Sequence, residues 1–221
     1  MAGVEASAAY DRRVFRNRSR IEKPAPGKRN SVRIIGGGWR GRRVQFPDSP
    51  GLRPTPDRVR ETLFNWLQQS IQGTRCLDLF AGSGALGIEA LSRGAREVVF
   101  VEQVHGPALA LSVELERLGG SSRARVIETG AQRFLAAPGD PFDGIFLDPP
   151  YGRGYLADCV AAIEAGNWVK AGGWVYLESE RTAGVPAIPP HWDLVKSKSA
   201  GEVGYHLARI SAARIRARAG E

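Results

Sequence analysis

The sequence predicts an α/β protein with a seven-stranded, mostly parallel sheet, helices on both faces, an antiparallel C-terminal strand and a small N-terminal β-hairpin. From Arg75 onward, short apolar segments alternate with helical stretches, which is the pattern of parallel strands joined by crossover helices. The last two apolar segments lie close together around Ala200 and Gly201, with no room for a crossover helix, so we expect them to pair antiparallel. The length of 221 residues suits one domain with an extension.

The first expected elements precede this alternation. Two short apolar and basic segments, 32–35 and 42–46, flank a glycine-rich turn and predict a small basic hairpin. The sequence Thr-Pro-Asp at 55–57 then supplies an N-cap, a first-turn proline and a first-turn acid, so a helix is expected to start there. Apolar residues recur at helical spacing through about Ser70, which gives this helix one apolar face against the body of the protein.

The alternating part of the chain gives the remaining elements. Strands are expected at 76–79, 98–102, 124–128, 144–148 and 174–178, with the antiparallel pair at 192–198 and 204–210. Helices are expected at 85–93, 107–118, 131–136 and 155–167. We therefore divide the chain into a flexible basic arm (1–30), a basic β-hairpin extension (31–54) and a main domain (55–221) with a frayed Arg-rich end at 214–218.

The positive charge of the chain is concentrated near its N-terminus. Residues 1–60 hold 15 Lys or Arg against five Asp or Glu, a net +10, whereas residues 61–221 hold 16 against 18, a net −2. A basic segment on a nearly neutral body indicates a polyanionic partner held at one place, and nucleic acid is the first expectation.

Composition disfavours several classes of protein. No apolar run approaches the ~18 residues that span a membrane, and no apolar segment follows the early charges as in a secretory signal, so we expect a cytoplasmic protein. Cys76 and Cys159 form no Cys-x-x-Cys pair and are expected to be buried thiols. The three histidines lack metal-ligand spacing, so we expect no metal site.

A glycine-rich loop joins the first strand of the alternating part to its helix. It contains Gly82-x-Gly84-x-x-Gly87, and Glu102 lies 20 residues beyond Gly82 at the end of the next strand, where a carboxylate can accept hydrogen bonds from ribose hydroxyls. An adenosine cofactor is therefore expected. Asp78, just before the loop, disfavours the pyrophosphate of NAD and suits the cationic S-adenosylmethionine; its alternative role is to cap the helix.

A second motif, Asp148-Pro149-Pro150-Tyr151, ends the fourth strand of this part, at the sheet edge where open α/β proteins bind ligands. The prolines stop the strand and leave the Asp148 carboxylate and the Pro149 carbonyl as fixed acceptors. Two acceptors that hold the two N–H bonds of an aromatic amine favour a pyramidal nitrogen and stabilise its developing positive charge, while Tyr151 can stack on the base. The motif therefore predicts methyl transfer to an aromatic amine.

With both motifs in place, the chain resembles the class I methyltransferases, which have a Rossmann-like fold, and among them the RsmD family of bacterial ribosomal RNA methyltransferases. The resemblance covers about residues 32–210 and is carried by RIIGG at 33–37, WRG at 39–41, RPTPDRVRETLFNWL at 53–67 and DLFAGSGALG at 78–87. It implies transfer of a methyl group from S-adenosylmethionine to the exocyclic N2 amine of a guanine in 16S ribosomal RNA, guanine 966 in standard numbering. The first 30 residues match no pattern of the family.

The resemblance also implies which residues contact the cofactor. Glu102 is expected to hold the ribose and Gln103 to flank the adenine. Gly130 stands where the family has an Asn, so the adenine contact is left to the backbone of Ala131. Five residues at the glycine loop are expected to line the cofactor: Asp78, Phe80, Gly82, Ser83 and Gly84.

Two further groups of residues receive roles from the resemblance. Thr55 and Arg58 match the helix that closes over the methionine end of the cofactor; their alternative roles are an N-cap and a solvated charge. The expected partner is ribosomal RNA or an assembly intermediate of the small ribosomal subunit. We expect the protein to act as a monomer and to bind no membrane. Contact with RNA phosphate is expected from five arginines: Arg33, Arg40, Arg42, Arg43 and Arg53.

Three alternatives stay open. A methyltransferase for DNA adenine N6 or for a protein glutamine amide uses a related four-residue motif, although Asp rather than Asn at position 148 disfavours the amide and the resemblance of the hairpin and first helix disfavours DNA. A non-catalytic RNA-binding assembly factor that keeps an idle cofactor pocket has no need of the acids at 78, 102 and 148. An NAD-dependent oxidoreductase is the remaining alternative for the glycine loop.

Overall fold

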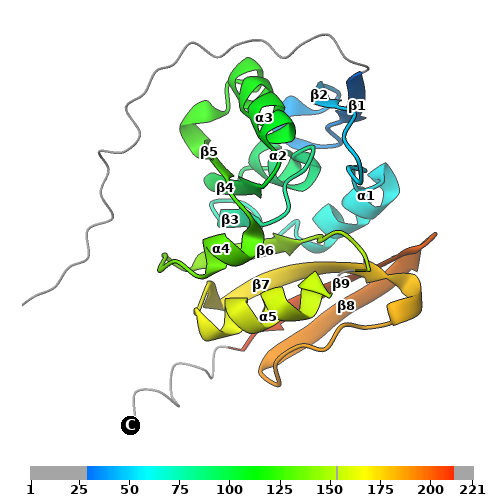
Figure 1. Ribbon diagram of the computed structural model, residues 1–221, viewed down its shortest axis with the longest axis vertical. Coiled ribbons are helices and arrows are strands. Elements are labelled where there is room, and N and C mark those ends of the chain that lie inside the picture. Colours follow the sequence, from blue (N-terminus) through cyan, green and yellow to red (C-terminus); the bar gives the residue numbers. More distant parts are fainter. Residues whose placement is uncertain (1–28, 153, 212–221) are drawn as a thin grey trace, which may run out of the picture.

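The computed structural model describes residues 29–152 and 154–211, which are arranged around a seven-stranded sheet (Figure 1). The expected arm (1–30) lies outside the described residues except for its last two, and so does the Arg-rich end at 214–218. The strand order is β5-β4-β3-β6-β7-β9-β8. Neighbours from β5 to β7 are parallel, and β9 is antiparallel to both β7 and β8. The predicted sheet, with its antiparallel closing pair, is confirmed.

Most element bounds lie within two residues of their predictions. The sheet strands are β3 (Arg75–Asp78), β4 (Glu97–Glu102), β5 (Ala124–Glu128), β6 (Phe142–Leu147), β7 (Val169–Glu180), β8 (Trp192–Ala200) and β9 (Val203–Ile210). The helices are α1 (Asp57–Trp66), α2 (Ala85–Ser92), α3 (His105–Leu118), α4 (Ala131–Leu135) and α5 (Tyr155–Ala165). Strand β7 begins earlier than predicted because Gly172 and Gly173 form an irregularity within it rather than ending it. No helix in the described ranges is long and apolar enough to cross a bilayer.

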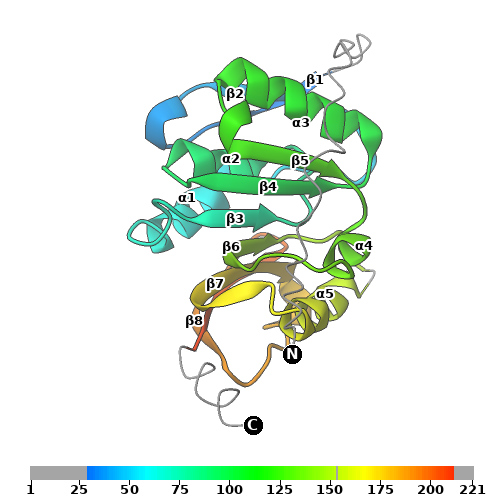
Figure 2. The same ribbon diagram turned by 90° about the vertical axis from the view of Figure 1, so that its left-hand side faces the viewer.

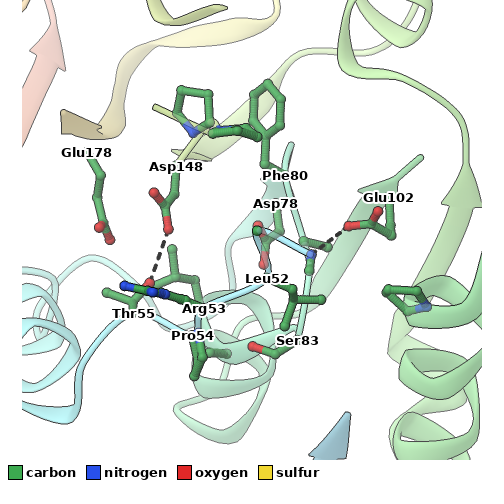
Figure 3. Close-up of a pocket in the computed structure, with 18 of the residues that line it drawn as sticks. Leu52, Arg53, Pro54, Thr55, Asp78, Phe80, Ser83, Glu102, Asp148 and Glu178 are labelled. Carbon is green, nitrogen blue, oxygen red and sulfur yellow. Dashed lines mark hydrogen bonds between the residues drawn. The ribbon is translucent and has the colours of Figure 1, made fainter. Parts of the chain in front are cut away.

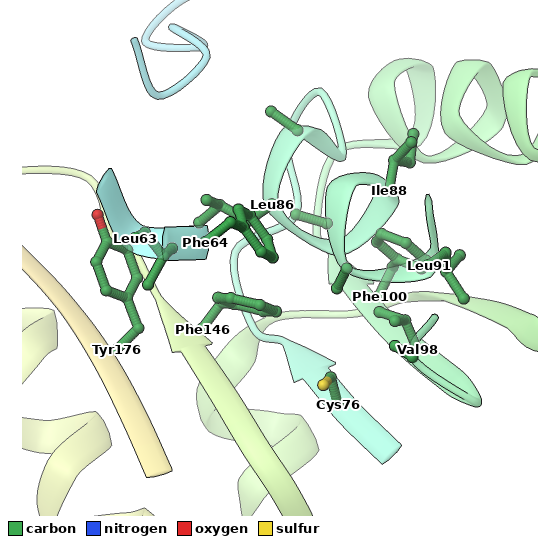
Figure 4. Packing of buried hydrophobic residues seen from close by; sticks show 14 of the residues in the cluster. Leu63, Phe64, Cys76, Leu86, Ile88, Leu91, Val98, Phe100, Phe146 and Tyr176 are labelled. Atoms are coloured by element: carbon green, nitrogen blue, oxygen red, sulfur yellow. The ribbon is translucent and has the colours of Figure 1, made fainter. Parts of the chain in front are cut away.

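Two apolar layers cover the two faces of the sheet, because successive residues of a strand point to opposite faces. Cys76 and Phe100 face the layer that contains α1, α2 and α3 (Figure 4). Leu77 and Val99, their neighbours in β3 and β4, face α4 and α5, which lie together on the opposite side of the sheet from α1 (Figure 2). The central strands are thus buried on both faces, which explains their continuous apolar runs.

The predicted N-terminal hairpin is present as β1 (Arg29–Arg33) and β2 (Arg43–Pro47), joined through the short 3₁₀ helix η1 (Gly37–Trp39). It lies beside α3 and touches α2 through its turn (Figure 1). A Cβ on Gly37, whose φ is +76°, would lie 1.9 Å from the carbonyl oxygen of Ser92 at the end of α2. The turn therefore requires glycine both for its conformation and for its close approach to α2.

Helix α1 begins differently from its prediction. Its N-cap is Pro56, and no side chain caps the helix. The hydroxyl of Thr55 donates instead to Oδ2 of Asp148 at 3.3 Å. The predicted N-cap role of Thr55 is therefore wrong, because a long-range partner on another element occupies the hydroxyl. The helix ends at Trp66, and turns carry the chain on to Ile71.

Candidate active site

A cavity of about 600 Å³ opens at the carboxyl ends of β3, β4, β6 and β7 (Figure 3). Open α/β sheets bind ligands at this edge. The structure does not bring Gly84 or Arg58 into the cavity lining. The other predicted cofactor and catalytic residues line it, together with one predicted RNA-binding residue: Thr55, Asp78, Phe80, Gly82, Ser83, Glu102, Gln103, Ala131, Asp148, Pro149, Pro150, Tyr151 and Arg53.

The glycine loop passes from the end of β3 to the start of α2 and forms one wall of the cavity. Gly82 and Gly84 have φ values of +50° and +74°, a region that favours glycine. A Cβ on Gly84 would lie 2.4 Å from Cδ1 of Leu111 in α3. Gly84 therefore serves the turn and its packing on α3 rather than the lining.

Glu102 fixes the loop to the end of β4. Its Oε2 accepts a hydrogen bond from the Gly82 N–H at 2.9 Å, and its Oε1 accepts one from the Val104 N–H at 2.8 Å. A carboxylate offers about four lone-pair positions, so two remain for other donors. The orientation of Glu102 at the cavity wall is thus set by backbone groups, and acceptors are left for a pair of ligand hydroxyls.

Asp78 lies at the end of β3 and is only 2% exposed. Its Oδ2 accepts a hydrogen bond from the N–H of Gly87, in the first turn of α2, at 2.9 Å. Burial raises the pKa of Asp78 to about 7, with smaller contributions from the negative charges of Asp148 and Glu102. Both placements considered for this residue, as a cap of the helix and in the wall of the pocket, are therefore present.

The Asp-Pro-Pro-Tyr segment leaves the end of β6 on the opposite wall. Burial raises the pKa of Asp148 to about 6, while the hydrogen bond from Thr55 lowers it. Pro149 is buried, whereas Pro150 and Tyr151 are exposed at the cavity mouth. The 41% exposure of the Tyr151 side chain leaves its ring available for stacking.

Glu178 is a site residue that the sequence reasoning missed. It lies on β7 next to the strand that carries Asp148, and its side chain points the same way as that of Asp148 (Figure 3). Its Oε1 accepts a hydrogen bond from the Tyr176 hydroxyl at 2.8 Å. Glu178 is 2% exposed, and burial followed by the charge of Asp148 raises its pKa well above the usual range. The available signal was an acid at the end of a predicted strand, as at Glu102 and Asp148.

The cavity is strongly acidic. None of the ion pairs within the described residues involves Asp78, Asp148 or Glu178. Acids that have no basic partner favour a cationic ligand and disfavour an anionic group such as a pyrophosphate. Among the described residues, the charged side chains of the lining are five acids and one arginine: Asp78, Glu102, Asp148, Glu178, Glu202 and Arg53.

The predicted RNA-binding arginines do not form one group. Arg53 lines the cavity, whereas the other four lie on or near the hairpin. Arg42 donates to the carbonyls of Arg117 and Leu118 at the C-terminal end of α3, at 2.9 and 3.4 Å. Nη2 of Arg33 lies 3.6 Å from Oδ2 of Asp57 in an ion pair, and the guanidinium of Arg43 donates to the hydroxyl of Ser31. Arg40 is exposed and lines a small hollow with Arg33.

Comparisons with known proteins agree on one family. A family model described as Conserved hypothetical protein 95 matches residues 32–209. Ribosomal RNA small subunit methyltransferase D of Escherichia coli (strain K12) is 46% identical over 187 residues, which cover 85% of this chain and 94% of that protein. The protein of the same name from Haemophilus influenzae is 44% identical over 186 residues, covering 82% and 95%. The solved structure of yhhF from Escherichia coli matches with a TM-score of 0.78 and 44% identity, covering 83% of this chain and 99% of that one.

Proposed function

This chain belongs to the RsmD family of methyltransferases, and we propose that it transfers a methyl group from S-adenosylmethionine to the N2 amine of a guanine in 16S ribosomal RNA, guanine 966 in standard numbering. The observation that carries the proposal is the pair of acceptors at Asp148 and Pro149, at the end of β6, in the wall of an acid-lined cavity. The name of the curated relatives supports small-subunit ribosomal RNA as the substrate. The proposed catalytic unit is the main domain, 55–221, with 31–54 as its RNA-binding extension.

The residues of the cavity fit S-adenosylmethionine. When bound, this cofactor supplies an electrophilic methyl group on a positively charged sulfur. Asp78 and the other unpaired acids match its two positive centres, and the free lone pairs of Glu102 match the two ribose hydroxyls. Gln103 and Ala131 also line the cavity, and we assign them to contact with the adenine. An NAD pyrophosphate finds only one cationic side chain in the described lining, Arg53.

Asp148 and Pro149 supply the chemistry at the nitrogen. The Asp148 carboxylate and the Pro149 carbonyl oxygen accept the two amine hydrogens, which localises the nitrogen lone pair for attack. Thr55 holds one carboxylate oxygen in place by its hydrogen bond. A pKa of about 6 leaves Asp148 mostly ionised near pH 7, so the carboxylate stabilises the positive charge on the nitrogen and can then take its proton.

The exposed arginines of the hairpin favour a substrate with many phosphates. Arg40 and Arg43 are exposed, and Tyr151 offers a ring at the cavity mouth for the extruded base. We assign RNA phosphate to the exposed hairpin arginines, and we place Arg53 at the cavity rather than on the hairpin surface. The protein is proposed to act as a cytoplasmic monomer on ribosomal RNA or an assembly intermediate of the small subunit.

A transfer assay with tritiated S-adenosylmethionine tests the proposal against its alternatives. The acceptors are small ribosomal subunits, naked 16S RNA, DNA and release factor, followed by mass spectrometry of the labelled nucleoside. Label in N2-methylguanine from ribosomal RNA is expected. Label in N6-methyladenine or methylglutamine would replace the proposal by one of those activities, and no label on any acceptor would favour an assembly factor. A rise in melting temperature with NADH but not with S-adenosylhomocysteine would favour the oxidoreductase.

A further inference from the structure

We propose that Glu178 is the residue that selects guanine, by accepting a hydrogen bond from guanine N1–H while Asp148 holds the neighbouring N2 amine. The inference rests on the proposed function and adds to it a specificity residue outside the Asp-Pro-Pro-Tyr motif. It begins with the position of Glu178 in the sheet. Leu147 of β6 pairs with Leu177 of β7, so Asp148 and Glu178 directly follow a paired position on adjacent parallel strands.

The two carboxyl groups therefore lie side by side in one wall of the cavity. Partners on adjacent parallel strands point to the same face, and such strands are about 4.8 Å apart. Figure 3 shows both side chains directed toward Thr55, whose hydroxyl bonds to Asp148. An amine bound at Asp148 thus presents its neighbouring ring position toward Glu178. The N2 amine of guanine is flanked by N1–H, a donor, and by N3, an acceptor, and a carboxylate can accept a hydrogen bond only from N1–H. Beside the N6 amine of adenine the ring nitrogen is N1 without hydrogen, an acceptor.

The hydrogen bonds of Glu178 leave one oxygen for a ligand. Tyr176 donates its hydroxyl to Oε1. The Thr55 hydroxyl also acts on Glu178 and lowers its pKa, but its single hydrogen is donated to Asp148. The described residues hold no arginine, lysine or histidine in an ion pair with Glu178. Burying an unpaired carboxyl group is unfavourable unless something compensates it. A donor supplied by the substrate provides that compensation, because guanine N1–H enters the cavity with the base. Burial raises the pKa of Glu178, and a hydrogen bond donated by the base to the ionised carboxylate favours that ionised form.

The bond to Tyr176 makes one substitution especially informative. In Glu178→Gln the amide oxygen keeps the Tyr176 hydroxyl as its donor, so the amide NH₂ takes the place of Oε2. An acceptor is thereby exchanged for a donor with almost no change of volume. The NH₂ group faces N1–H of guanine unfavourably and N1 of 2-aminopurine favourably. 2-Aminopurine keeps the 2-amino group but has neither a hydrogen on N1 nor the O6 of guanine. The change in preference between wild type and Glu178→Gln therefore reports on Glu178.

The experiment measures kcat/KM for methyl transfer to small subunits reconstituted with a ligated RNA that carries guanine or 2-aminopurine at the target position. We expect wild type to prefer guanine by about 10- to 100-fold, the discrimination of one hydrogen bond to a charged or strongly polar acceptor. Glu178→Gln is expected to lose at least about 10-fold on guanine while holding or gaining rate on 2-aminopurine. The control, Tyr176→Phe, keeps the carboxyl group and should retain the preference for guanine.

The outcomes separate this inference from the proposed function. If wild type methylates neither RNA, the proposed function fails. If wild type prefers guanine and Glu178→Gln slows both substrates equally, the inference about Glu178 is overturned and the proposed function stands. Equal affinity for S-adenosylhomocysteine and equal melting temperatures check that each variant is folded; for an unfolded Gln variant, Glu178→Asp replaces it and must reduce the preference for guanine.

Discussion

Buried carboxyl groups occur in two regions of the molecule, and their surroundings differ. Glu89 in α2 is fully buried on the side of the hairpin. It accepts hydrogen bonds from the N–H groups of Ile35 and Gly36, each at 2.8 Å, and from Arg93 at 2.7 Å, and it pairs with buried Arg60 at 3.5 Å. Every acceptor position of Glu89 is thus used within the protein.

The acids of the cavity lack that compensation, although Asp78 and Glu178 are buried and Asp148 is partly buried. Asp78 receives one backbone donor from Gly87, Asp148 one hydroxyl from Thr55, and neither enters an ion pair among the described residues. The difference teaches how to separate a structural acid from a functional one in this chain. A carboxyl group whose lone pairs are all used fixes two segments together, whereas one that is buried with acceptors to spare awaits a ligand that brings donors or positive charge.

The largest expected effect is on stability, at Glu89. Glu89→Ala removes the buried one of the two carboxylates that pair with Arg60, leaving only Asp57, and it also frees the two hairpin N–H groups. The free energy of unfolding should therefore fall by about 3 to 5 kcal/mol. Urea denaturation measures it. Glu89→Gln, which keeps an acceptor, should lose less. A loss under about 1 kcal/mol for the alanine variant would contradict the structural role.

Asp148 should show the opposite behaviour. Asp148→Ala removes the acceptor for the target amine, and kcat for methyl transfer should fall at least about 10²- to 10³-fold, while S-adenosylhomocysteine still binds in calorimetry. Stability should hold or rise, because a partly buried acid with little compensation is removed. Full activity in this variant would refute the mechanism, and a loss of stability like that of Glu89→Ala would erase the contrast.

The raised pKa of Asp78 gives the cavity a pH dependence. The group binds its proton with a pKa of about 7 in the folded protein against 3.8 as its ordinary value. Its contribution to stability is therefore complete in acid and is lost as the pH rises from about 4 through about 7. Between pH 5 and pH 8, the free energy of unfolding of wild type should fall by about 2 to 3 kcal/mol relative to that of Asp78→Asn. Urea denaturation without cofactor measures both. Parallel stability curves for the two proteins would show that Asp78 is not the titrating group.

The fold was largely predictable because its signal is local. Burial of the central strands on both faces gives each one an apolar run, and the crossover helices separate those runs. The predicted ends of helices and strands were less accurate where a tertiary contact intervened. At the start of α1, the Thr55 hydroxyl bonds to Asp148 rather than to its own helix. Periodicity within a segment carries no information on such a partner.

The site was predictable in part for the same reason. Asp78, Glu102 and Asp148 end or follow strands that the sequence marks, and parallel strands bring their carboxyl ends to one edge. Glu178 also ends a predicted strand. Its proximity to Asp148 depends on β7 lying beside β6, and the local sequence pattern does not predict the order of strands in the sheet. The hairpin arginines were likewise indistinguishable until α3 was placed beside β2.

The smallest expected effect separates two of those arginines. Arg40 is exposed, and the guanidinium of Arg42 donates to two carbonyls at the C-terminal end of α3. Arg40→Ala should weaken RNA binding and reduce the slope of log K against log salt by about 0.7, the value for one phosphate contact on a single strand. Arg42→Ala removes the same charge but should leave the slope unchanged and instead cost about 1 kcal/mol of stability. Fluorescence titrations from 50 to about 200 mM salt measure the slopes. Equal slopes for the two variants would mean that position on the hairpin does not matter, and that charge alone, rather than a free guanidinium, governs the contact with RNA.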